Sequence, residues 1–125
     1  MKKQPYDLIV IGSGAAGMMS AITAKNRCEN ILLIEQLPTL GSKLKATGGG
    51  RCNLSNTLDD LTFMNSFGKN GRFMRDALNL FNHNSLIEFL GDIGVETHIP
   101  DGFRIFPVTH NSSTIINALK DELNR

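Results

Sequence analysis

The fold is decided by one short segment near the start of the chain, Tyr6-Asp-Leu-Ile-Val-Ile-Gly-Ser-Gly-Ala-Ala-Gly17. Residues 8–11 form an unbroken apolar run, which is typical of a strand buried on both faces of a parallel sheet. This run leads directly into a fingerprint with glycine at positions 12, 14 and 17. The segment therefore predicts a strand over residues 6–11 that turns sharply into a helix.

Each glycine of this turn has its own physical role. Gly12 lets the chain reverse out of the strand, Gly14 leaves room for a pyrophosphate at the backbone, and Gly17 lets the helix pack close to the strand. The helix is expected over residues 14–26, and the N–H groups at its start would face phosphate oxygens. Its predicted buried face consists of Ala15, Met18, Met19 and Ile22.

A second apolar run completes the unit. Residues 31–34 are again entirely apolar, and Glu35 follows them directly. A carboxylate at the tip of the second strand can accept hydrogen bonds from a ribose hydroxyl group. Strand, glycine turn, helix, strand and acid occur in this order within about thirty residues, which is the pattern of a dinucleotide site. An ordinary glycine-rich turn in an α/β unit is the less favoured alternative.

Composition narrows the classes of function. Of the 125 residues, 41% are hydrophobic and 20% are charged, as expected of one globular domain. The net charge of +1 argues against nucleic acid or an anionic membrane as the main partner. Residues 1–5 lead directly into the first strand and leave no room for a signal peptide, so we expect a cytoplasmic protein. Cys28 and Cys52 have no metal-ligand spacing, and we expect reduced thiols and no metal site.

The rest of the chain predicts a long loop followed by helices. Residues 36–71 show no sustained periodicity and hold much of the chain's Gly, Ser, Thr and Asn, but their apolar side chains argue against disorder. Beyond this loop we expect a helix at 72–81 and a second helix that ends at Gly91 or Gly94. Asn82-His-Asn-Ser85 offers several N-cap candidates for the second helix, and Ser85-x-x-Glu88 matches a capping box. Short strands are expected at 95–99 and 103–106, and a last helix from Ser112 onward.

These elements predict an α/β fold. A Rossmann-like βαβ unit is followed by a long glycine-rich loop and helices. Two long buried strands are fewer than a doubly wound fold needs, and the last helix reaches the final residue without a cap or a following breaker. We therefore expect an incomplete portion of a larger three-layer fold, either a fragment or the product of a truncated gene.

A second informative stretch is Gly41-Ser-Lys-Leu-Lys-Ala-Thr-Gly-Gly-Gly-Arg-Cys-Asn53. Its three successive glycines tolerate left-handed backbone conformations and expose N–H groups, so they can form an anion-binding nest. Lys43, Lys45 and Arg51 add positive charge suited to a phosphate or to a reduced flavin. A flexible glycine linker is the open alternative, and the residue order of a Walker loop is absent.

The chain resembles the N-terminal part of the bacterial FAD-dependent flavoproteins of the aminoacetone-oxidase type. The resemblance rests on the glycine fingerprint, Glu35, Gly41-Ser-Lys-Leu44, Arg104-Ile-Phe-Pro107 and above all Thr47-Gly-Gly-Gly-Arg-Cys-Asn-Leu-Ser-Asn56. The family has glycine directly before the arginine of the Arg104 signature, whereas Phe103 stands there in this chain. The resemblance implies that residues 1–125 are the N-terminal part of an FAD-binding domain, without an inserted substrate domain and the C-terminal FAD-domain segments.

The resemblance also implies which residues bind FAD. The fingerprint would hold the pyrophosphate, Glu35 the adenosine ribose, and Lys43 with its neighbours the adenosine half, while residues 47–53 would run toward the flavin. The implied FAD-binding residues are Gly12, Ser13, Gly14, Ala15, Ala16, Gly17, Glu35, Gln36, Lys43, Leu44, Thr47, Gly48, Gly49, Gly50, Arg51, Cys52 and Asn53. Cys52 is expected to pack within the loop rather than to react, and no catalytic residue is identified.

The function implied by the resemblance is an FAD-dependent oxidoreductase. It would transfer hydride on a small amine or a conjugated carbonyl substrate, with NAD(P)H as a candidate electron donor. This chain by itself is expected to be inactive. We expect a small-molecule substrate and neither nucleic acid nor a membrane as a partner, and a homo-oligomer is an open alternative. Two other functions stay open, an NAD(P)-binding dehydrogenase or regulatory module, and a non-catalytic truncated remnant.

Overall fold

The computed structural model describes residues 5–125. Of residues 1–5, which precede the first predicted strand, residues 1–4 therefore lie outside the described part. The chain divides into two compact units, which are described separately. The first unit runs to Cys52 and includes Asn111–Arg125, and the second unit is Asn53–His110. None of the helices between residues 5 and 125 has both the length and the apolar composition needed to cross a membrane.

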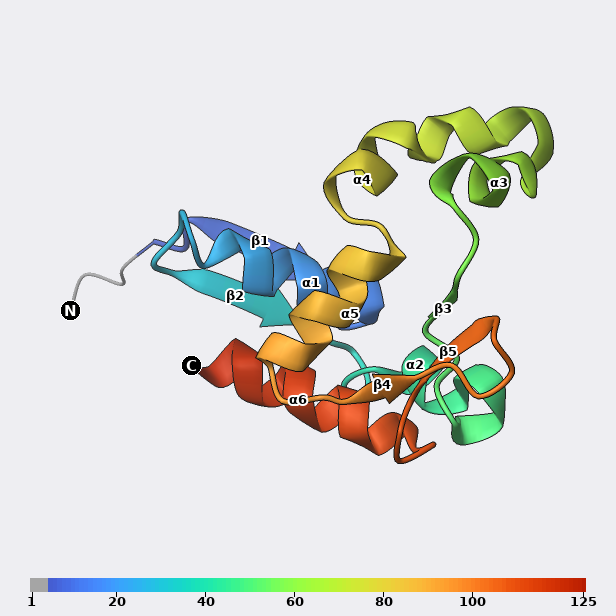
Figure 1. The fold of residues 1–125 in the computed structure, drawn as a ribbon. Coiled ribbons are helices and arrows are strands. Elements are labelled where there is room, and N and C mark those ends of the chain that lie inside the picture. Colours follow the sequence, from blue (N-terminus) through green and yellow to red (C-terminus); the bar gives the residue numbers. More distant parts are fainter. Residues whose placement is uncertain (1–4) are drawn as a thin grey trace. The chain divides into compact units, whose positions relative to one another are not determined.

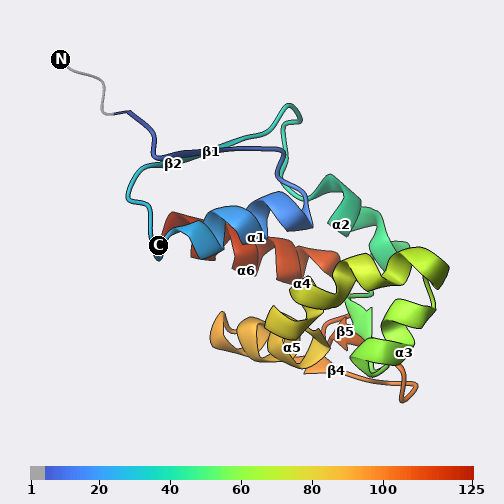
Figure 2. The same ribbon diagram turned by 90° about the horizontal axis from the view of Figure 1, so that it is seen from above.

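The first unit contains the predicted βαβ arrangement. Strand β1 (Leu8–Ile11) leads through the glycine turn into helix α1 (Ala15–Ala24), and strand β2 (Ile31–Ile34) pairs parallel to β1 in a register that sets Leu8 opposite Ile31. Figures 1 and 2 show α1 against this two-stranded sheet, with helix α6 (Ser112–Asn124) alongside α1. The sequence prediction of an α/β fold with a Rossmann-like unit is confirmed.

One face of the β1–β2 sheet is covered within the described residues. Along β1, Leu8 and Val10 are half-buried, whereas Ile9 is 53% exposed and Ile11 is 84% exposed. Successive side chains of a strand point to opposite faces, and the covering helix α1 lies on one of them. The expectation that the strands are buried on both faces is therefore wrong for the described residues.

The buried face of α1 also differs from the prediction. Met18, Ala21 and Ile22 are buried, whereas Ala15 is exposed because it lies in the first turn, next to the glycine turn. The three buried positions keep the helical spacing i, i+3, i+4 that places side chains on one face. The helical period was predicted correctly, and Met18 and Ile22 belong to the buried face as expected. The first predicted position, Ala15, does not belong to it, and Ala21 does.

The stretch predicted as an irregular loop contains short helices. In the first unit these are α2 (Ser42–Ala46) and the 3₁₀ helix η1 (Thr47–Gly50). The Gly41 N–H donates to the Ser13 carbonyl (3.0 Å), and the Ser112 hydroxyl donates to the Lys45 carbonyl (3.2 Å). These two bonds attach α2 to the glycine turn and to α6.

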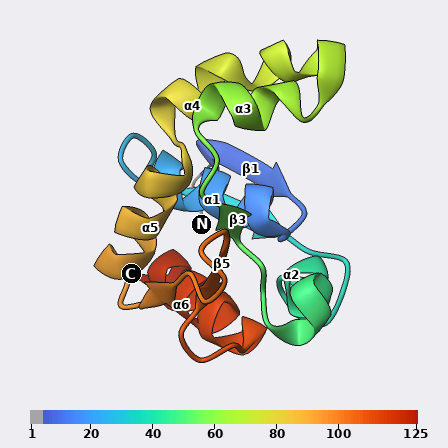
Figure 3. The ribbon, with the colours of Figure 1, turned by 45° about the vertical axis from the view of Figure 1, so that its right-hand side comes forward.

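The second unit combines a small antiparallel sheet with helices. Its sheet has the order β3 (Ser55–Asn56), β5 (Arg104–Pro107), β4 (Thr97–His98). Figure 3 shows α3 beside the segment formed by the 3₁₀ helix η2 and α4. The helices of this unit are α3 (Asp60–Asn65), η2 (Gly68–Met74), α4 (Arg75–Leu80) and α5 (His83–Asp92). Its buried apolar residues are Leu90, Val95, Ile105 and Phe106.

One prediction about the helices of this unit is wrong, because the helix expected at 72–81 is divided between η2 and α4. Among the N-cap candidates between Asn82 and Ser85, it is Asn82 and not the capping-box Ser85 that precedes α5. The Asn82 side chain accepts hydrogen bonds from the N–H groups of Asn84 (3.0 Å) and Ser85 (3.2 Å). Asparagine is as good an N-cap as serine, and α5 begins directly after the first of the predicted candidates.

The end of α5 gives a testable contrast between two glycines. Gly91 lies inside the helix, and no described atom comes within 4 Å of a Cβ added there, whereas Gly94 has φ +84° just beyond the helix end. We expect Gly91→Ala to stabilise the protein by about 0.5–1 kcal/mol, because alanine loses less backbone entropy on folding. Gly94→Ala should destabilise it by about 1–2 kcal/mol, because its Cβ disfavours a left-handed backbone. Urea unfolding of both variants measures these changes in the free energy of unfolding. Equal changes would contradict the placement of Gly91 inside the helix and of Gly94 beyond its end.

Candidate dinucleotide site

The glycine turn joins the end of β1 to the start of α1. Gly12 has φ +96°, and its N–H donates to the Ile34 carbonyl at the end of β2 (2.7 Å). Gly14 is the N-cap of α1, and no side chain within the described residues caps this helix end. The N–H groups of the first helical turn have no partner within the helix, and they carry its positive dipole end. This end of α1 is therefore suited to bind an anion.

The three fingerprint glycines differ in what surrounds them. A Cβ built on Gly14 meets no described atom within 4 Å, and the φ of −69° there suits any residue. A Cβ built on Gly17 would lie 1.8 Å from the Gly12 carbonyl oxygen. The structure thus separates their roles, since Gly17 is required for packing and Gly14 leaves open space.

Glu35 is held against the glycine turn. Its Oε2 atom accepts hydrogen bonds from the Ser13 N–H (2.8 Å) and from the Ser13 hydroxyl (2.6 Å), and its Oε1 atom accepts one from the Leu37 N–H (2.9 Å). These bonds, the one from the Ser13 hydroxyl first, lower the pKa of Glu35 to about 2. Glu35 is therefore a carboxylate at neutral pH. Sequence reasoning placed this acid correctly at the strand tip but did not identify Ser13 as its partner.

A cavity of about 510 Å³ opens beside this turn, at the carboxyl ends of β1 and β2. This is the edge of a parallel sheet where ligands of α/β proteins bind, and the volume lies within the range of small-molecule sites. The residues that line the cavity are Ile11, Gly12, Ser13, Gly14, Ile34, Glu35, Gln36, Leu37, Ser42 and Lys43. The cavity therefore combines a carboxylate and a lysine with apolar side chains.

The structure brings together six of the predicted site residues, namely Gly12, Ser13, Gly14, Glu35, Gln36 and Lys43, around this cavity. Ala15, Ala16 and Gly17 follow in the first turn of α1, and Leu44 lies in α2. The remaining predicted residues are Thr47 to Gly50 in η1, then Arg51 and Cys52, and Asn53, with which the second unit begins. The prediction did not include Ile11, Ile34, Leu37 and Ser42, although all four directly flank predicted site residues in the sequence.

The glycine triplet adopts the left-handed backbone that the sequence predicts for it. Gly48, Gly49 and Gly50 have φ of 61°, 67° and 87°, values that only glycine adopts without strain. The N–H groups of Arg51 and Cys52 donate to carbonyls within the loop, at Gly48 (3.4 Å) and Thr47 (2.9 Å). The segment is thus an ordered turn rather than a flexible linker, and two of its N–H groups are already used.

Cys52 is a structural residue by its surroundings. Its side chain is fully buried, and this burial raises the pKa of the thiol. The reactive form of cysteine is the thiolate, which burial disfavours. These observations support the expectation that Cys52 packs within the protein. In addition, no group of three or more potential metal-ligating side chains occurs between residues 5 and 125.

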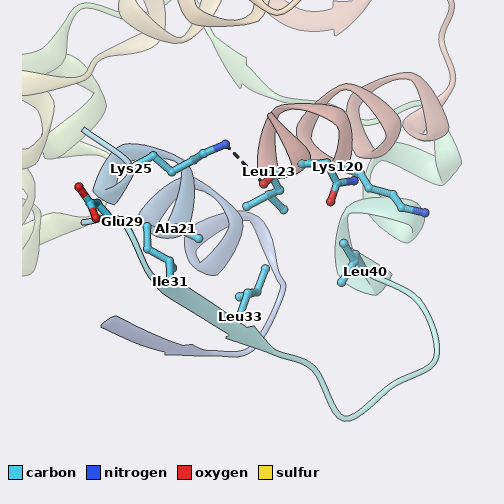
Figure 4. A pocket seen from close by; sticks show the side chains of 9 residues that line it. Ala21, Lys25, Glu29, Ile31, Leu33, Leu40, Lys120 and Leu123 are labelled. Atoms are coloured by element: carbon cyan, nitrogen blue, oxygen red, sulfur yellow. Dashed lines mark hydrogen bonds between the residues drawn. The ribbon is translucent and has the colours of Figure 1, made fainter. Parts of the chain in front are cut away.

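A second cavity of about 360 Å³ lies between α1, β2 and the end of α6 (Figure 4). Its lining includes the apolar side chains of Ala21, Ile31, Leu33, Leu40 and Leu123, with Lys25 at the edge. The Lys25 ammonium group donates to the Glu122 carbonyl (2.8 Å) and to the Leu123 carbonyl (3.4 Å) at the end of α6, and the dashed line in Figure 4 marks the bond to Leu123. Lys25 therefore serves helix capping here, and the cavity beside Glu35 is the stronger candidate for a ligand site.

The arrangement at the first cavity fits a dinucleotide. The space at Gly14 and the uncapped end of α1 suit a pyrophosphate, and the Glu35 carboxylate suits ribose hydroxyls. The apolar side chains of Ile11, Ile34 and Leu37 offer surface to a purine ring. The described residues thus fit the phosphate and nucleoside part of such a cofactor.

Comparison with known proteins agrees with this geometry. Residues 6–125 match the family model described as HI0933-like protein Rossmann domain. The chain is 32% identical over 118 residues to the 3-dehydro-bile acid delta(4,6)-reductase of Clostridium scindens, and 30% identical over 120 residues to the ribosomal RNA dihydrouridine synthase of Escherichia coli. These matches cover 93% and 96% of this chain but 28% and 29% of the two relatives.

A further match covers a smaller part of this chain. The 3-oxosteroid 1-dehydrogenase of Mycolicibacterium smegmatis is 42% identical over 50 residues, which is 40% of this chain and 9% of that protein. The chain therefore spans less than a third of the length of each of these three relatives.

Proposed function

Because the chain belongs to the family of HI0933-like Rossmann domains, we propose that it is the N-terminal part of the FAD-binding domain of an oxidoreductase. The observation that carries this proposal is the Glu35 carboxylate, held by Ser13 at the edge of a cavity that also contains Gly14. A dinucleotide needs both features, a carboxylate for the ribose and bare backbone for the pyrophosphate.

In this proposal each cluster of residues has a definite task. The first turn of α1 and Gly14 bind the pyrophosphate, Glu35 accepts hydrogen bonds from the adenosine ribose, and Lys43 adds a positive charge to the cavity lining. The glycine triplet of η1, with Arg51, lies toward the flavin end. FAD supplies the hydride chemistry, and the protein binds and orients it.

One observation favours FAD over NAD(P) as the resident cofactor. The stretch after β2 is ordered into α2 and η1 by left-handed glycines, which suits a longer cofactor than NAD. The names of the relatives, a reductase, a dehydrogenase and a dihydrouridine synthase, fit either cofactor. An NAD(P)-binding module remains the second candidate, since the glycine turn and Glu35 would serve either dinucleotide.

The substrate that this proposal favours is a small conjugated carbonyl compound. Two relatives are named for oxo compounds, a 3-dehydro bile acid and a 3-oxosteroid, and none of the three names mentions an amine. We propose NAD(P)H as the electron donor. It would transfer a hydride to FAD, and the reduced FAD would then transfer a hydride to the substrate. Oxidation of a small amine is the alternative reaction.

The test of this proposal starts from the cofactor in the purified intact protein. We expect flavin absorbance bands, and FAD on mass analysis of the released cofactor. Under anaerobic conditions NADH or NADPH should bleach these bands, and an enone should restore them while a small amine should not. A colourless protein that binds NAD(P) with FAD in excess would contradict the proposal and support the second candidate.

Glu35→Gln is expected to weaken FAD binding by roughly 5- to 30-fold, because a hydrogen bond to a charged acceptor is stronger than one to a neutral acceptor. The matched control is Glu29→Gln, which removes the same charge before the opposite end of β2 and should leave the affinity unchanged. Fluorescence titration with FAD measures both variants. Equal affinities for Glu35→Gln and wild type would remove Glu35 from the site.

A further inference from the structure

We propose that Ser13 is a positioning residue of the dinucleotide site, which sets the orientation of the Glu35 carboxylate through its buried hydroxyl group. This inference rests on the proposed function and adds a residue to it. Ser13 stands between Gly12 and Gly14, at a position where the fingerprint accepts any residue. Its side chain is nonetheless fully buried, which is uncommon for serine.

The geometry gives Ser13 control of one carboxylate oxygen. Both its N–H and its hydroxyl donate to Glu35 Oε2, at 2.8 and 2.6 Å, so this atom is held by two bonds from one residue. The Leu37 N–H holds Oε1 from the other side. A carboxylate oxygen has two lone pairs, and the bond from Leu37 leaves Oε1 with one to offer to a ribose hydroxyl. Ser13 thus fixes the rotation of the group that a ligand meets.

The carbonyl of Ser13 is also used, because it accepts a hydrogen bond from the Gly41 N–H (3.0 Å) at the start of α2. One buried residue therefore connects the glycine turn with the tip of β2 and with α2, and all three contribute to the cavity lining. A site residue held by packing and by supporting hydrogen bonds stays within the narrow range of orientations that binding requires.

The charge state of Glu35 supplies a readout that a merely structural serine would not move. The hydroxyl bond from Ser13 is the largest cause of the low pKa of Glu35, and Lys43 is the other charged residue among the described lining of the cavity. Removing the hydroxyl should raise the pKa of Glu35 toward its ordinary value, while the bonds from the two N–H groups keep it below that value. Binding that needs the carboxylate would then begin to fall at a higher pH than it does in the wild type.

The experiment is a double-mutant cycle in the intact protein. We expect Ser13→Ala to weaken FAD binding by about 3- to 10-fold at pH 7, and to lose further affinity on acidification at a pH where the wild type still keeps its own. In a Glu35→Gln background the same substitution should change the affinity less than twofold, because Ser13 acts through the carboxylate. Carboxyl NMR titration should show a raised pKa of Glu35 in Ser13→Ala.

Several outcomes separate this inference from the proposed function. If the wild type binds FAD but Ser13→Ala has the same affinity and pH profile, the role of Ser13 is wrong and the proposed function stands. An equal loss in the Glu35→Gln background would also overturn it, because Ser13 would then act independently of Glu35. Ser13→Cys keeps the shape with a weak donor, so it should bind like Ser13→Ala if the hydroxyl matters. A wild type that binds no FAD contradicts both proposals.

Discussion

Gly17→Ala is expected to destabilise the protein by at least about 3 kcal/mol, the upper end of the usual cost of overpacking. The added Cβ would lie 1.8 Å from the Gly12 carbonyl oxygen and 2.9 Å from its carbon atom, both of which belong to the backbone. Rotation of a side chain cannot relieve this contact, so α1 must move away from the glycine turn. That movement separates Met18 and Ile22 from the core they fill.

Urea unfolding of the variant measures the loss, and Gly14→Ala is the matched control. It adds the same methyl group three residues earlier, where no described atom lies within 4 Å and the backbone is extended. We expect this control to keep the stability of the wild type within about 1 kcal/mol, since glycine is itself a moderate N-cap. Equal stabilities for Gly17→Ala and Gly14→Ala would show that helix and turn are not packed as closely as described.

The sequence predicted the βαβ unit well because several independent signals coincide there. Two apolar runs, a glycine fingerprint and an acid at the strand tip each indicate the same arrangement, and the parallel register of β1 and β2 confirms it. The apolar runs could not reveal that one sheet face stays open. An apolar run such as residues 8–11 indicates side chains suited to burial on both faces of the sheet. The segments that bury each face lie elsewhere in the chain, and the described residues bury only one face.

The short helices of the predicted loop were missed for a different reason. Helix α2 has five residues and α3 has six, so neither is long enough to show a repeating apolar face. Their stability comes from specific bonds, such as the Asp59 side chain accepting from the Thr62 N–H (2.9 Å) in α3 and the long-range bond from Ser112 to Lys45 in α2. Long-range bonds of this kind have no periodic pattern in the sequence.

In the candidate site, too, the sequence predicted the residues that follow a spacing pattern and missed a contact that does not. Glu35 and the glycines were predicted because their spacing is constrained by the ligand chemistry. The Ser13 hydroxyl was not identified as the partner of Glu35, because a serine at a variable position carries no spacing signal and its partner is 22 residues away. Likewise, the sequence offered several N-cap candidates between Asn82 and Ser85 without ranking them, and in the structure Asn82 caps α5.

Gly14→Val is expected to weaken FAD binding by at least about 100-fold while the fold survives. The open space at Gly14 is where the pyrophosphate has to approach the backbone, and the branched side chain would occupy it. Loss of two or more hydrogen bonds to a charged phosphate, at about 1.5–3 kcal/mol each, accounts for this factor. The φ of −69° and ψ of −176° at this residue suit valine, so the backbone is not strained.

The measurement combines FAD titration with thermal unfolding, because weaker binding can also follow from lower stability. Valine is a poor N-cap, so Gly14→Val should lose about 1 kcal/mol of stability. Ile22→Val, in the buried face of the same helix, should lose about 0.5–1.5 kcal/mol and still bind FAD like the wild type. Because the two variants are matched in stability, a selective loss of binding in Gly14→Val assigns the effect to the pyrophosphate position. Full FAD binding by Gly14→Val would place the pyrophosphate elsewhere.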